Sequence, residues 1–297
     1  MAKMLSKVAP WLASRSDTGG FTFRNLVHED TAALRDLTAL DPVANVFVAS
    51  QLEGSGTAVP PVTGAIVLGC FTADGALASA CWIGANVVPV GVTADQAVHF
   101  GQWIVSSQRR IASIFGPADA VLGIYRAMAD LGAACLEVRA NQPLLEARNR
   151  PALPGHPGLR PSHSDDYAEI LPAAAAMFEE EVGYSPFLGG DESYRRRVAA
   201  LIRQGHSFSH LDPLGRVIFK ADLGAVSRQV SQIQGVWLAP EYRGQGLSAA
   251  YMAAVVQLAL DVAPVTSLYV NDYNARARAT YSRVGFSQVG TFATVLF

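Results

Sequence analysis

Residues 236–251 read VWLAPEYRGQGLSAAY, and the fold assignment starts from this stretch. An apolar strand ends at Leu238, Pro240 stops strand pairing, and Arg243 with two glycines leads into an apolar, alanine-rich helix. Glycines let backbone N–H groups turn toward a ligand, and the first turn of a helix leaves N–H groups unpaired at the positive end of its dipole. The stretch therefore predicts a pyrophosphate-binding loop, with Arg243 adding a charge-assisted hydrogen bond.

Two motifs carry a family resemblance. Residues 243–248 follow Arg-x-x-Gly-x-Ser, which resembles motif A (Gln/Arg-x-x-Gly-x-Gly/Ala) of the GCN5-related N-acetyltransferase (GNAT) superfamily. Ser248 departs from that motif but is small, so close backbone approach survives. Residues 268–286 resemble motif B, in which a strand leads into a helix capped by Asn274 and Tyr281 precedes a Gly-Phe turn. The nucleotide fingerprints GxGxxG and GxxxxGK[ST] do not occur in this region.

The resemblance covers residues 158–297 and implies that acetyl-coenzyme A (acetyl-CoA) binds across both motifs. The residues expected to contact it are Val236, Trp237, Leu238, Arg243, Gly244, Gln245, Gly246, Leu247, Ser248, Ala249, Asn271, Asn274 and Tyr281. The strand before motif A would pair with the pantetheine arm, and the N–H at Leu238 would stabilise the oxyanion. Tyr281 would protonate the departing thiolate, because a phenol with a pKa of about 10 is a competent acid. A helix cap at Asn274 and core packing at Tyr281 are the alternatives.

The general base is left open among the glutamates at 179–181. They precede Tyr184 in the region where the family builds its acceptor site. We expect Glu180 to act as the base through a water molecule, and Glu181 and Tyr184 to line the acceptor site. A solvated acidic helix end is the alternative interpretation.

The strand before motif A and the chain end supply further candidates. Gln232 and Gln234 are expected to share a face with Val236 and Leu238 and to hold the acceptor or a water. In some tandem members of the superfamily the terminal carboxylate reaches the active site. The Phe297 carboxylate, on a last strand expected beside the motif A strand, is therefore an alternative base.

The clearest interruption of the strand and helix pattern is the segment RNRPALPGHPGLRP at residues 148–161. Its prolines and glycines predict a linker at 151–160 between a domain over 1–150 and a catalytic GNAT domain over 158–297. Strands and helices interleave on both sides of it, so the fold class expected is α/β. We expect two tandem acetyltransferase-like domains, each with a mixed, mostly antiparallel sheet flanked by helices. No residue-level repeat between them is evident.

The N-terminal half is expected to be a degenerate copy. Its counterpart of motif A, near residues 87–96, has no Arg-x-x-Gly-x-Gly/Ala pattern. Residues 41–45 and 139–144 resemble segments of an uncharacterised domain that precedes the acetyltransferase domain in a group of actinobacterial proteins. This half would then shape the acceptor cleft or dock a partner.

Composition narrows the function classes. The 297 residues are 50% hydrophobic and 16% charged, with a formal net charge of −2. This balance argues against a nucleic-acid partner and against disorder, and no apolar run is long enough for an integral membrane segment. Three widely spaced cysteines favour a reduced, cytoplasmic protein, and no Cys/His cluster has metal-ligand spacing, so no metal is expected. Residues 1–13 are weakly amphipathic and would dock on the protein itself, with membrane contact as the alternative.

The resemblance implies an acetyl-CoA-dependent N-acetyltransferase, an acyltransferase acting on a small-molecule amine or a protein amine. Because no cysteine lies in the motif region, direct attack in a ternary complex is expected. A longer acyl-CoA donor is one alternative, and a non-catalytic acyl-CoA-binding sensor or scaffold is another. The assembly is left open between a monomer and a homodimer.

Overall fold

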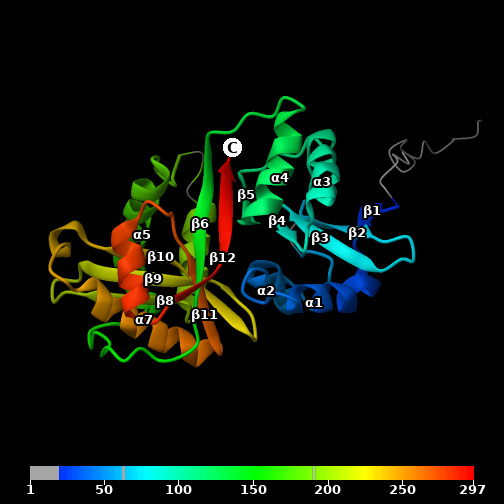
Figure 1. The fold of residues 1–297 in the computed structure, drawn as a ribbon. Helices are drawn as coiled ribbons and strands as arrows, with labels where there is room; N and C mark the ends of the chain where they lie inside the picture. Colours follow the sequence, from blue (N-terminus) through cyan, green and yellow to red (C-terminus); the bar gives the residue numbers. More distant parts are fainter. Residues whose placement is uncertain (1–19, 62–63, 189, 191) are drawn as a thin grey trace, which may run out of the picture.

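The computed structural model describes residues 20–61, 64–188, 190 and 192–297. In these residues the chain forms one sheet of twelve strands with helices packed against it (Figure 1). The described part of the chain contains no helix that is both long enough and apolar enough to span a bilayer. The amphipathic segment expected at residues 1–13 lies outside the described residues.

The two halves repeat one order of elements. The first half contributes β1 (Thr22–Asn25), α1 (Thr31–Ala39), α2 (Val46–Ser55), β2 (Ile66–Phe71), β3 (Leu77–Ile83), β4 (Asn86–Val90), α3 (Ala94–Ser106), β5 (Ser113–Pro117), α4 (Ala118–Ala129) and β6 (Glu137–Ala147). The second contributes β7 (Arg160–Pro161), α5 (Tyr167–Val182), α6 (Glu192–Arg203), β8 (Ser207–Leu211), β9 (Val217–Val226), β10 (Val230–Leu238), α7 (Ser248–Val262), β11 (Val265–Tyr269), α8 (Ala275–Arg283) and β12 (Ser287–Leu296). Short 3-10 turns precede α1, α5 and α7: His28–Asp30, Ser164–Asp166 and Pro240–Tyr242.

The sheet is mixed and mostly antiparallel, which confirms the predicted fold class. Its order is β1-β2-β3-β4-β5-β12-β6-β11-β10-β9-β8-β7. Among the described strands only β4–β5 and β10–β11 pair in parallel. Replacing each strand by its counterpart in the other half reverses this order, so the sheet has an internal pseudo-two-fold axis between β12 and β6.

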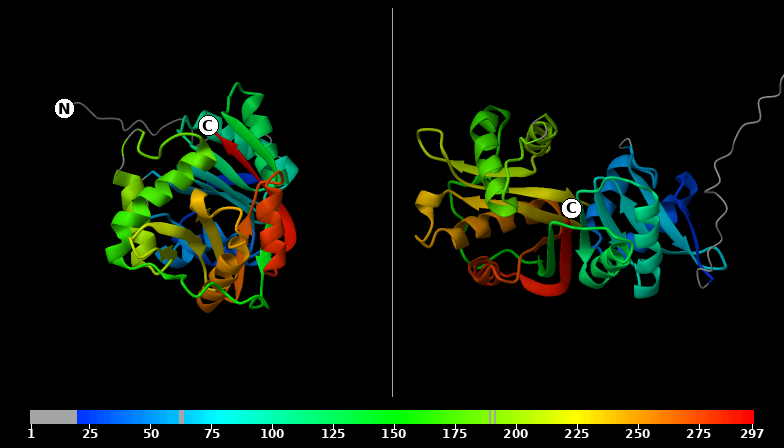
Figure 2. Two further views of the ribbon diagram at one scale, coloured as in Figure 1. Left: turned by 90° about the vertical axis from the view of Figure 1, so that its left-hand side faces the viewer. Right: turned by 90° about the horizontal axis from the view of Figure 1, so that it is seen from above.

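The sixth strand of each half is exchanged. β12 pairs with β5 of the first half, with Phe292 opposite Pro117. β6 pairs with β11 of the second half, with Leu144 opposite Tyr269. The two exchanged strands also pair with each other and stand side by side at the centre of Figure 1. Seen from above, the C-terminus therefore lies at the junction of the two halves (Figure 2).

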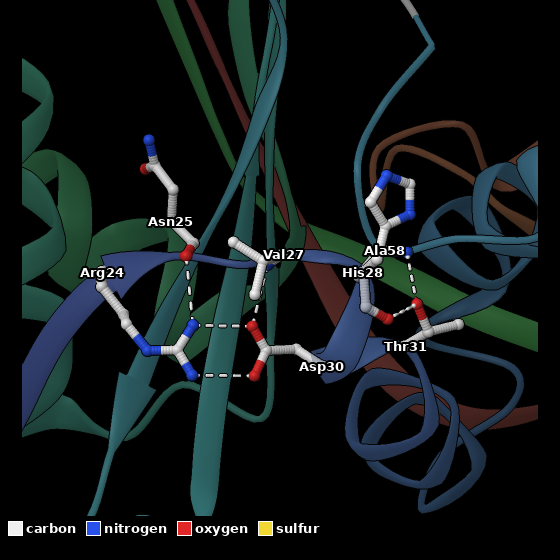
Figure 3. Close-up of polar contacts among 7 residues, drawn as sticks. All are labelled: Arg24, Asn25, Val27, His28, Asp30, Thr31 and Ala58. Carbon is white, nitrogen blue, oxygen red and sulfur yellow. Dashed lines mark hydrogen bonds and ion pairs between the residues drawn. The ribbon is translucent and has the colours of Figure 1, made fainter.

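A residue-level repeat joins the halves as well. Arg24 and Asp30 form a bidentate ion pair at 2.6 and 2.8 Å that fixes the turn from β1 into α1 (Figure 3). Arg160 and Asp166 form the same pair at 2.7 and 2.9 Å between β7 and α5, with both residues 136 positions further along the chain. This pair is a residue-level repeat, which was not evident from the sequence alone. Both pairs have the spacing Arg-x5-Asp, and the shared contact shows that the two arginines and the two aspartates are equivalent.

Separate apolar clusters lie on the two faces of the sheet. In the second half, α7 buries Tyr251, Met252 and Val255 against β9–β11, while α5 and α6 cover the opposite face around Ile170. The cluster beneath α3 and α4 includes Val295 of β12, so the end of the chain is part of the first half's core. Two α/β cores are thus joined through shared strands.

Candidate functional site

The parallel strands β10 and β11 pair only where they begin. Their register runs from Val230–Val265 to Gln232–Ser267. Beyond that point β10 follows β9, while β11 follows β6. The edge of β10 over residues 233–238 consequently has no strand partner on the β11 side within the described residues. An extended ligand can add to such an open edge by backbone hydrogen bonds.

A β-bulge lies in the middle of this open edge. The register with β9 shifts between Gln234 and Trp237, and Gly235 there has φ +60°. A Cβ at Gly235 would lie 3.1 Å from Asp222 Oδ2 and 3.2 Å from Lys220 Nζ, so the backbone conformation and the lack of space both require glycine. The bulge redirects the backbone groups that follow it along the open edge.

Lys220 and Asp222 of β9 hold this bulge, and sequence reasoning missed both. Lys220 is fully buried and donates to Asp222 Oδ2 at 2.6 Å and to the Gly235 carbonyl at 3.1 Å. The available signal was two charged residues on one face of an otherwise apolar strand, VIFKADLGAV.

The loop after β10 presents unpaired donors. Gly244 and Gly246 have φ of +77° and +76°, and α7 begins at Ser248. Within the described part of the chain, the backbone N–H groups of residues 244–247 have no hydrogen-bond acceptor. Four consecutive free N–H groups at the start of a helix form a nest for an anion.

Beyond their paired start, β10 and β11 diverge, and the last turn of α5 contacts residues on both sides of this divergence. Both Glu180 oxygens contact Arg243 Nη2, at 2.9 and 3.0 Å, and Glu180 Oε1 accepts from Trp237 Nε1 at 3.2 Å. The Glu181 carbonyl accepts from Arg139 Nη2 at 3.0 Å, and its carboxylate lies 3.9 Å from Nη1. Acidic residues are unfavourable at the negative end of a helix dipole, so these arginines compensate them.

Arg139 is the contribution of the first half to this region. It lies on the exchanged strand β6, and only 10% of its side chain is exposed. It also pairs with Glu137 at 2.9 Å, which raises the guanidinium pKa. Sequence reasoning did not identify it, because a residue of the N-terminal half reaches this position only through the strand exchange.

Two tyrosines lie near Glu181, and Tyr281 is buried while Tyr269 is partly buried. Burial, followed by the charge of Glu181, raises the pKa of Tyr281 and of Tyr269 to about 12. Tyr281 is 9% exposed and packs edge-on against Phe286. Neither hydroxyl has a hydrogen-bond partner within the described residues. Both groups therefore keep their protons at neutral pH and are free to donate them.

The two asparagines of motif B differ in their contacts. Asn274 caps α8, since its Oδ1 accepts the N–H of Ala277 at 3.1 Å. Asn271 accepts from Gln142 of β6 at 2.8 Å and donates to Tyr273 at 2.8 Å. The interpretation of Asn274 as a helix cap is thus confirmed. Asn271 links the site to the exchanged strand β6 through its hydrogen bond with Gln142.

The bulge changes which side chains share a face. Trp237 packs with the α5–α6 cluster, whereas Val236 and Leu238 pack with the α7 cluster. Gln234 accepts from Arg197 of α6 at 3.2 Å and so lies on the face of Trp237. The expectation that Gln234 shares a face with Val236 and Leu238 was wrong, because the extra residue at the bulge reverses the alternation.

The remaining predicted residues are spread out. Gln232 is 8% exposed at the end of the β10–β11 pairing, and Tyr184 is 47% exposed and packs edge-on against Phe178. Phe297 lies in the first half's core, with its ring 6.1 Å from that of Tyr125 and its N–H on the Ala112 carbonyl. The expectation that the last strand ends beside the motif A strand was wrong. That strand pairs with β5 and β6, so the structure does not bring Phe297 to the site.

The first half lacks the loop. Only residues 91–93 separate β4 from α3, against residues 239–247 between β10 and α7. Gln96 Oε1 accepts the N–H of Thr93 at 3.1 Å, so a capping box closes the start of α3. The described residues contain no group of three side chains that could hold a metal ion.

Comparisons with known proteins agree with this geometry. Residues 174–286 match the model of the acetyltransferase (GNAT) family, and residues 65–170 match a domain of unknown function, DUF4081. No curated protein matches the sequence.

Solved structures resemble the whole arrangement. A GNAT-family acetyltransferase from Colwellia psychrerythraea is 14% identical with a TM-score of 0.56, covering 93% of this chain and 99% of its own. A GCN5-related N-acetyltransferase from Sphaerobacter thermophilus is also 14% identical, with a TM-score of 0.58 and coverage of 93% and 94%. A tandem GNAT protein from the clavulanic acid biosynthesis pathway is 14% identical, with a TM-score of 0.55 and coverage of 92% and 98%. At these identities the likeness concerns the fold.

Proposed function

We propose that this chain, whose C-terminal half carries an acyltransferase domain of the GNAT family, transfers an acetyl group from acetyl-CoA to an amine. The observation that carries the proposal is the row of free N–H groups at residues 244–247, next to Arg243 and in line with the open edge of β10. A pyrophosphate followed by an extended amide-bearing arm matches this combination of donors.

The residues present fit that cosubstrate. The N–H groups of residues 244–247 and the Arg243 guanidinium would hold the pyrophosphate, and the open β10 edge would pair with the pantetheine amides. Asn271 and Asn274 lie at the start of α8, on the other side of the splayed strands. When bound, acetyl-CoA supplies an activated thioester.

The chain's own groups would then act on the thioester. The bulge at Gly235 aims the following backbone N–H groups, with that of Leu238 as the candidate, at the carbonyl oxygen that becomes negative. Tyr281 retains its proton because its pKa is raised to about 12, and it would donate that proton to the departing thiolate.

In this proposal Glu181, and not the expected Glu180, is the general base. Both Glu180 oxygens are held by Arg243, so this carboxylate faces the pyrophosphate loop. The Glu181 carboxylate is 57% exposed with one cation at 3.9 Å, and its charge acts on Tyr281 and Tyr269. We assign Glu181 to attract the ammonium form of the acceptor and to take its proton through a water.

Attack would be direct, in a ternary complex. The three cysteines, Cys70, Cys81 and Cys135, are free and lie in the first half, so none is placed to carry the acetyl group. Free thiols also suit the reducing cytoplasm, where we place the enzyme. The acceptor would be a small-molecule or protein amine, and the first half would be a divergent copy that does not bind acetyl-CoA.

Two measurements on the full chain test the proposal. Calorimetry should show one acetyl-CoA bound per chain, and a thiol-release assay over a library of primary amines should find at least one acceptor. Release from a longer acyl-CoA but not from acetyl-CoA would reassign the acyl group. Binding without release for any amine would show a sensor, and absence of binding would refute the proposal.

A further inference from the structure

A cavity of about 330 Å³ lies at the junction of the two halves. Its walls are residues 40–44 after α1, Pro117 at the end of β5, residues 144, 146 and 148 of β6, and residues 289–292 of β12. Its volume is in the range that binds small molecules. The segment at 41–45, which carried a resemblance in the sequence, forms part of this wall and has no role in the proposed acetyl transfer.

The pseudo-two-fold axis gives this cavity a counterpart. Pro117 ends β5 opposite Phe292 of the exchanged strand, just as Tyr269 ends β11 opposite Leu144 of the other exchanged strand. The β6–β12 register has the same symmetry. Exchanging the two strands maps the pair Gly290–Leu144 onto the pair Gln142–Phe292. The cavity in the first half therefore corresponds to the region around Tyr269 in the second half.

The helix that borders the cavity follows the same correspondence. The Arg–Asp pairs at the starts of α1 and α5 are offset by 136 positions, so residues 40–44 correspond to residues 176–180. Those residues form the last turns of α5, next to Glu181. The cavity thus corresponds to the place where we put the acceptor site of the second half under the proposed function. The first half has lost the pyrophosphate loop but kept this pocket open.

The charges of the wall select a ligand. Asp41 Oδ1 accepts the N–H of Ala44 at 3.0 Å, and no cation contacts the Asp41 carboxylate within the described residues. Glu146, whose side chain is 13% exposed, is paired at 2.7 and 3.0 Å with Arg148, whose side chain is 61% exposed. The wall thus carries two carboxylates, exposed Asp41 and part-buried Glu146, against the one guanidinium of Arg148, which gives it a negative excess.

Apolar side chains form the rest of the wall. Leu40, Pro42 and Val43 lie on one side and Val289 and Phe292 on the other. Leu40 is 81% exposed and Val289 is 47% exposed, so part of this apolar surface is open to solvent. A ligand with an apolar body would cover both.

We propose that this cavity binds a small protonated amine with an apolar body. The ammonium group lies between Asp41 and Glu146, and the body packs on Leu40, Val43 and Phe292. Because no pyrophosphate loop adjoins it, the first half holds this ligand without acetylating it. The volume and charge of the cavity carry this proposal, while its comparison with an acceptor site rests on the proposed function.

NMR of the full chain with labelled Leu and Val methyl groups tests this, using 2-phenylethylamine as the probe and no acetyl-CoA. We expect concentration-dependent shifts of the methyl signals of Leu40, Val43, Leu144 and Val289. The neutral isostere 2-phenylethanol should bind at least about tenfold more weakly, as the loss of a charge-assisted contact implies. Shifts confined to methyl groups near α5 and β10 would place the amine at the second half's site only and overturn the proposal.

Substitutions complete the test. The double variant Asp41→Asn/Glu146→Gln should weaken binding of the amine about tenfold or more while leaving 2-phenylethanol unchanged, whereas Asp36→Asn, an exposed carboxylate outside the cavity, should have no effect. Thr291→Trp should fill the cavity and abolish the methyl shifts in a folded chain. Equal binding of amine and alcohol, or unchanged binding in both cavity variants, would refute the assignment.

Discussion

Lys220 and Asp222 form a buried ion pair, 2.6 Å from Nζ to Oδ2, against Gly235. Lys220 is the only lysine after residue 7, and none of its surface is exposed. Burying a charge is expensive unless its hydrogen bonds are satisfied. Here the ammonium also donates to the Gly235 carbonyl at 3.1 Å, so the pair fixes the bulge that, under the proposed function, would aim the backbone at the thioester.

Lys220→Met should impair both stability and catalysis. Removing one partner of a buried pair leaves Asp222 uncompensated, which costs about 3–5 kcal/mol of unfolding free energy. In the protein that still folds, kcat should fall while the KM for acetyl-CoA changes little, because the pyrophosphate loop is untouched. Urea titration and steady-state kinetics measure the two effects.

The double variant Lys220→Met/Asp222→Leu separates positioning from stability. Replacing both partners by apolar groups should restore most of the unfolding free energy but should not restore kcat. Full recovery of kcat in this variant would show that the pair serves stability alone.

The local part of the site could be predicted from sequence. A strand that ends at a proline, a glycine-rich turn with an arginine and an apolar helix are neighbours along the chain, so residues 236–251 carry that information themselves. Asn274 as a helix cap is equally local. The mixed, mostly antiparallel sheet followed from the alternation of strands and helices.

The non-local part could not be predicted. Which strand lies beside β11 depends on pairing between segments more than 100 residues apart. The exchange of β6 and β12 has no signal in the sequence of either strand. For that reason Arg139 of the first half lies beside the second half's site, and Phe297 of the second half lies in the first half's core. The bulge at Gly235 reverses side-chain alternation through contacts with Lys220, which the sequence of β10 alone does not contain.

Arg243→Ala should weaken binding of acetyl-CoA. Under the proposed function the side chain would donate charge-assisted hydrogen bonds to the pyrophosphate, each of about 1.5–3 kcal/mol, so the Kd should rise roughly 10- to 100-fold. Binding of S-acetylpantetheine, which has no pyrophosphate, should not change. Calorimetry with both compounds measures this, and Arg203→Ala, an exposed arginine elsewhere on the domain, is the matched control.

Glu180→Gln should strengthen binding of acetyl-CoA. The Glu180 carboxylate is paired with Arg243, so it would compete with a bound pyrophosphate for the same guanidinium. Neutralising it should lower the Kd several-fold, with the effect shrinking at high salt because the pair is about half exposed. A loss of kcat with unchanged Kd would instead restore Glu180 as the base.

Tyr281→Phe should lower kcat by roughly 10²- to 10⁴-fold if the hydroxyl is the general acid. Phenylalanine keeps the contact with Phe286, so the melting temperature should stay within a few degrees. Because the pKa of Tyr281 is about 12, its deprotonation should not shape the pH–rate profile between pH 6 and 10. Unchanged kcat would leave Tyr281 with a packing role only.

A short Gly-Ser extension after Phe297 should leave turnover unchanged. The ring of Phe297 packs on Tyr125 in the first half, and β12 runs beside β5, away from β10. The terminal carboxylate is therefore not expected to reach an acceptor amine. Turnover and melting temperature of the extended chain test this, and a sharp loss of turnover without a loss of stability would reinstate the carboxylate as a catalytic group.

Stability should fall as the pH drops below about 6.5, through His156 and His210. His156 stacks on Tyr251 with ring centroids 4.1 Å apart, and His210 Nδ1 bonds the Tyr251 hydroxyl at 2.6 Å. Burial lowers the pKa of both imidazoles, and the pKa of His210 is lowered further by His156 and Arg160 while Asp212 opposes this.

The direction of the pH effect on stability follows from these lowered pKa values. The unfolded chain has the higher histidine pKa, so below about 6.5 it binds more protons than the folded chain and protonation favours unfolding. The double variant His156→Phe/His210→Asn should therefore show a smaller change in its urea midpoint between pH 7.5 and 5.5 than the wild type. A residual slope is expected from His206, whose pKa is also lowered by burial. Identical slopes in variant and wild type would mean that the Tyr251 cluster does not couple protonation to folding.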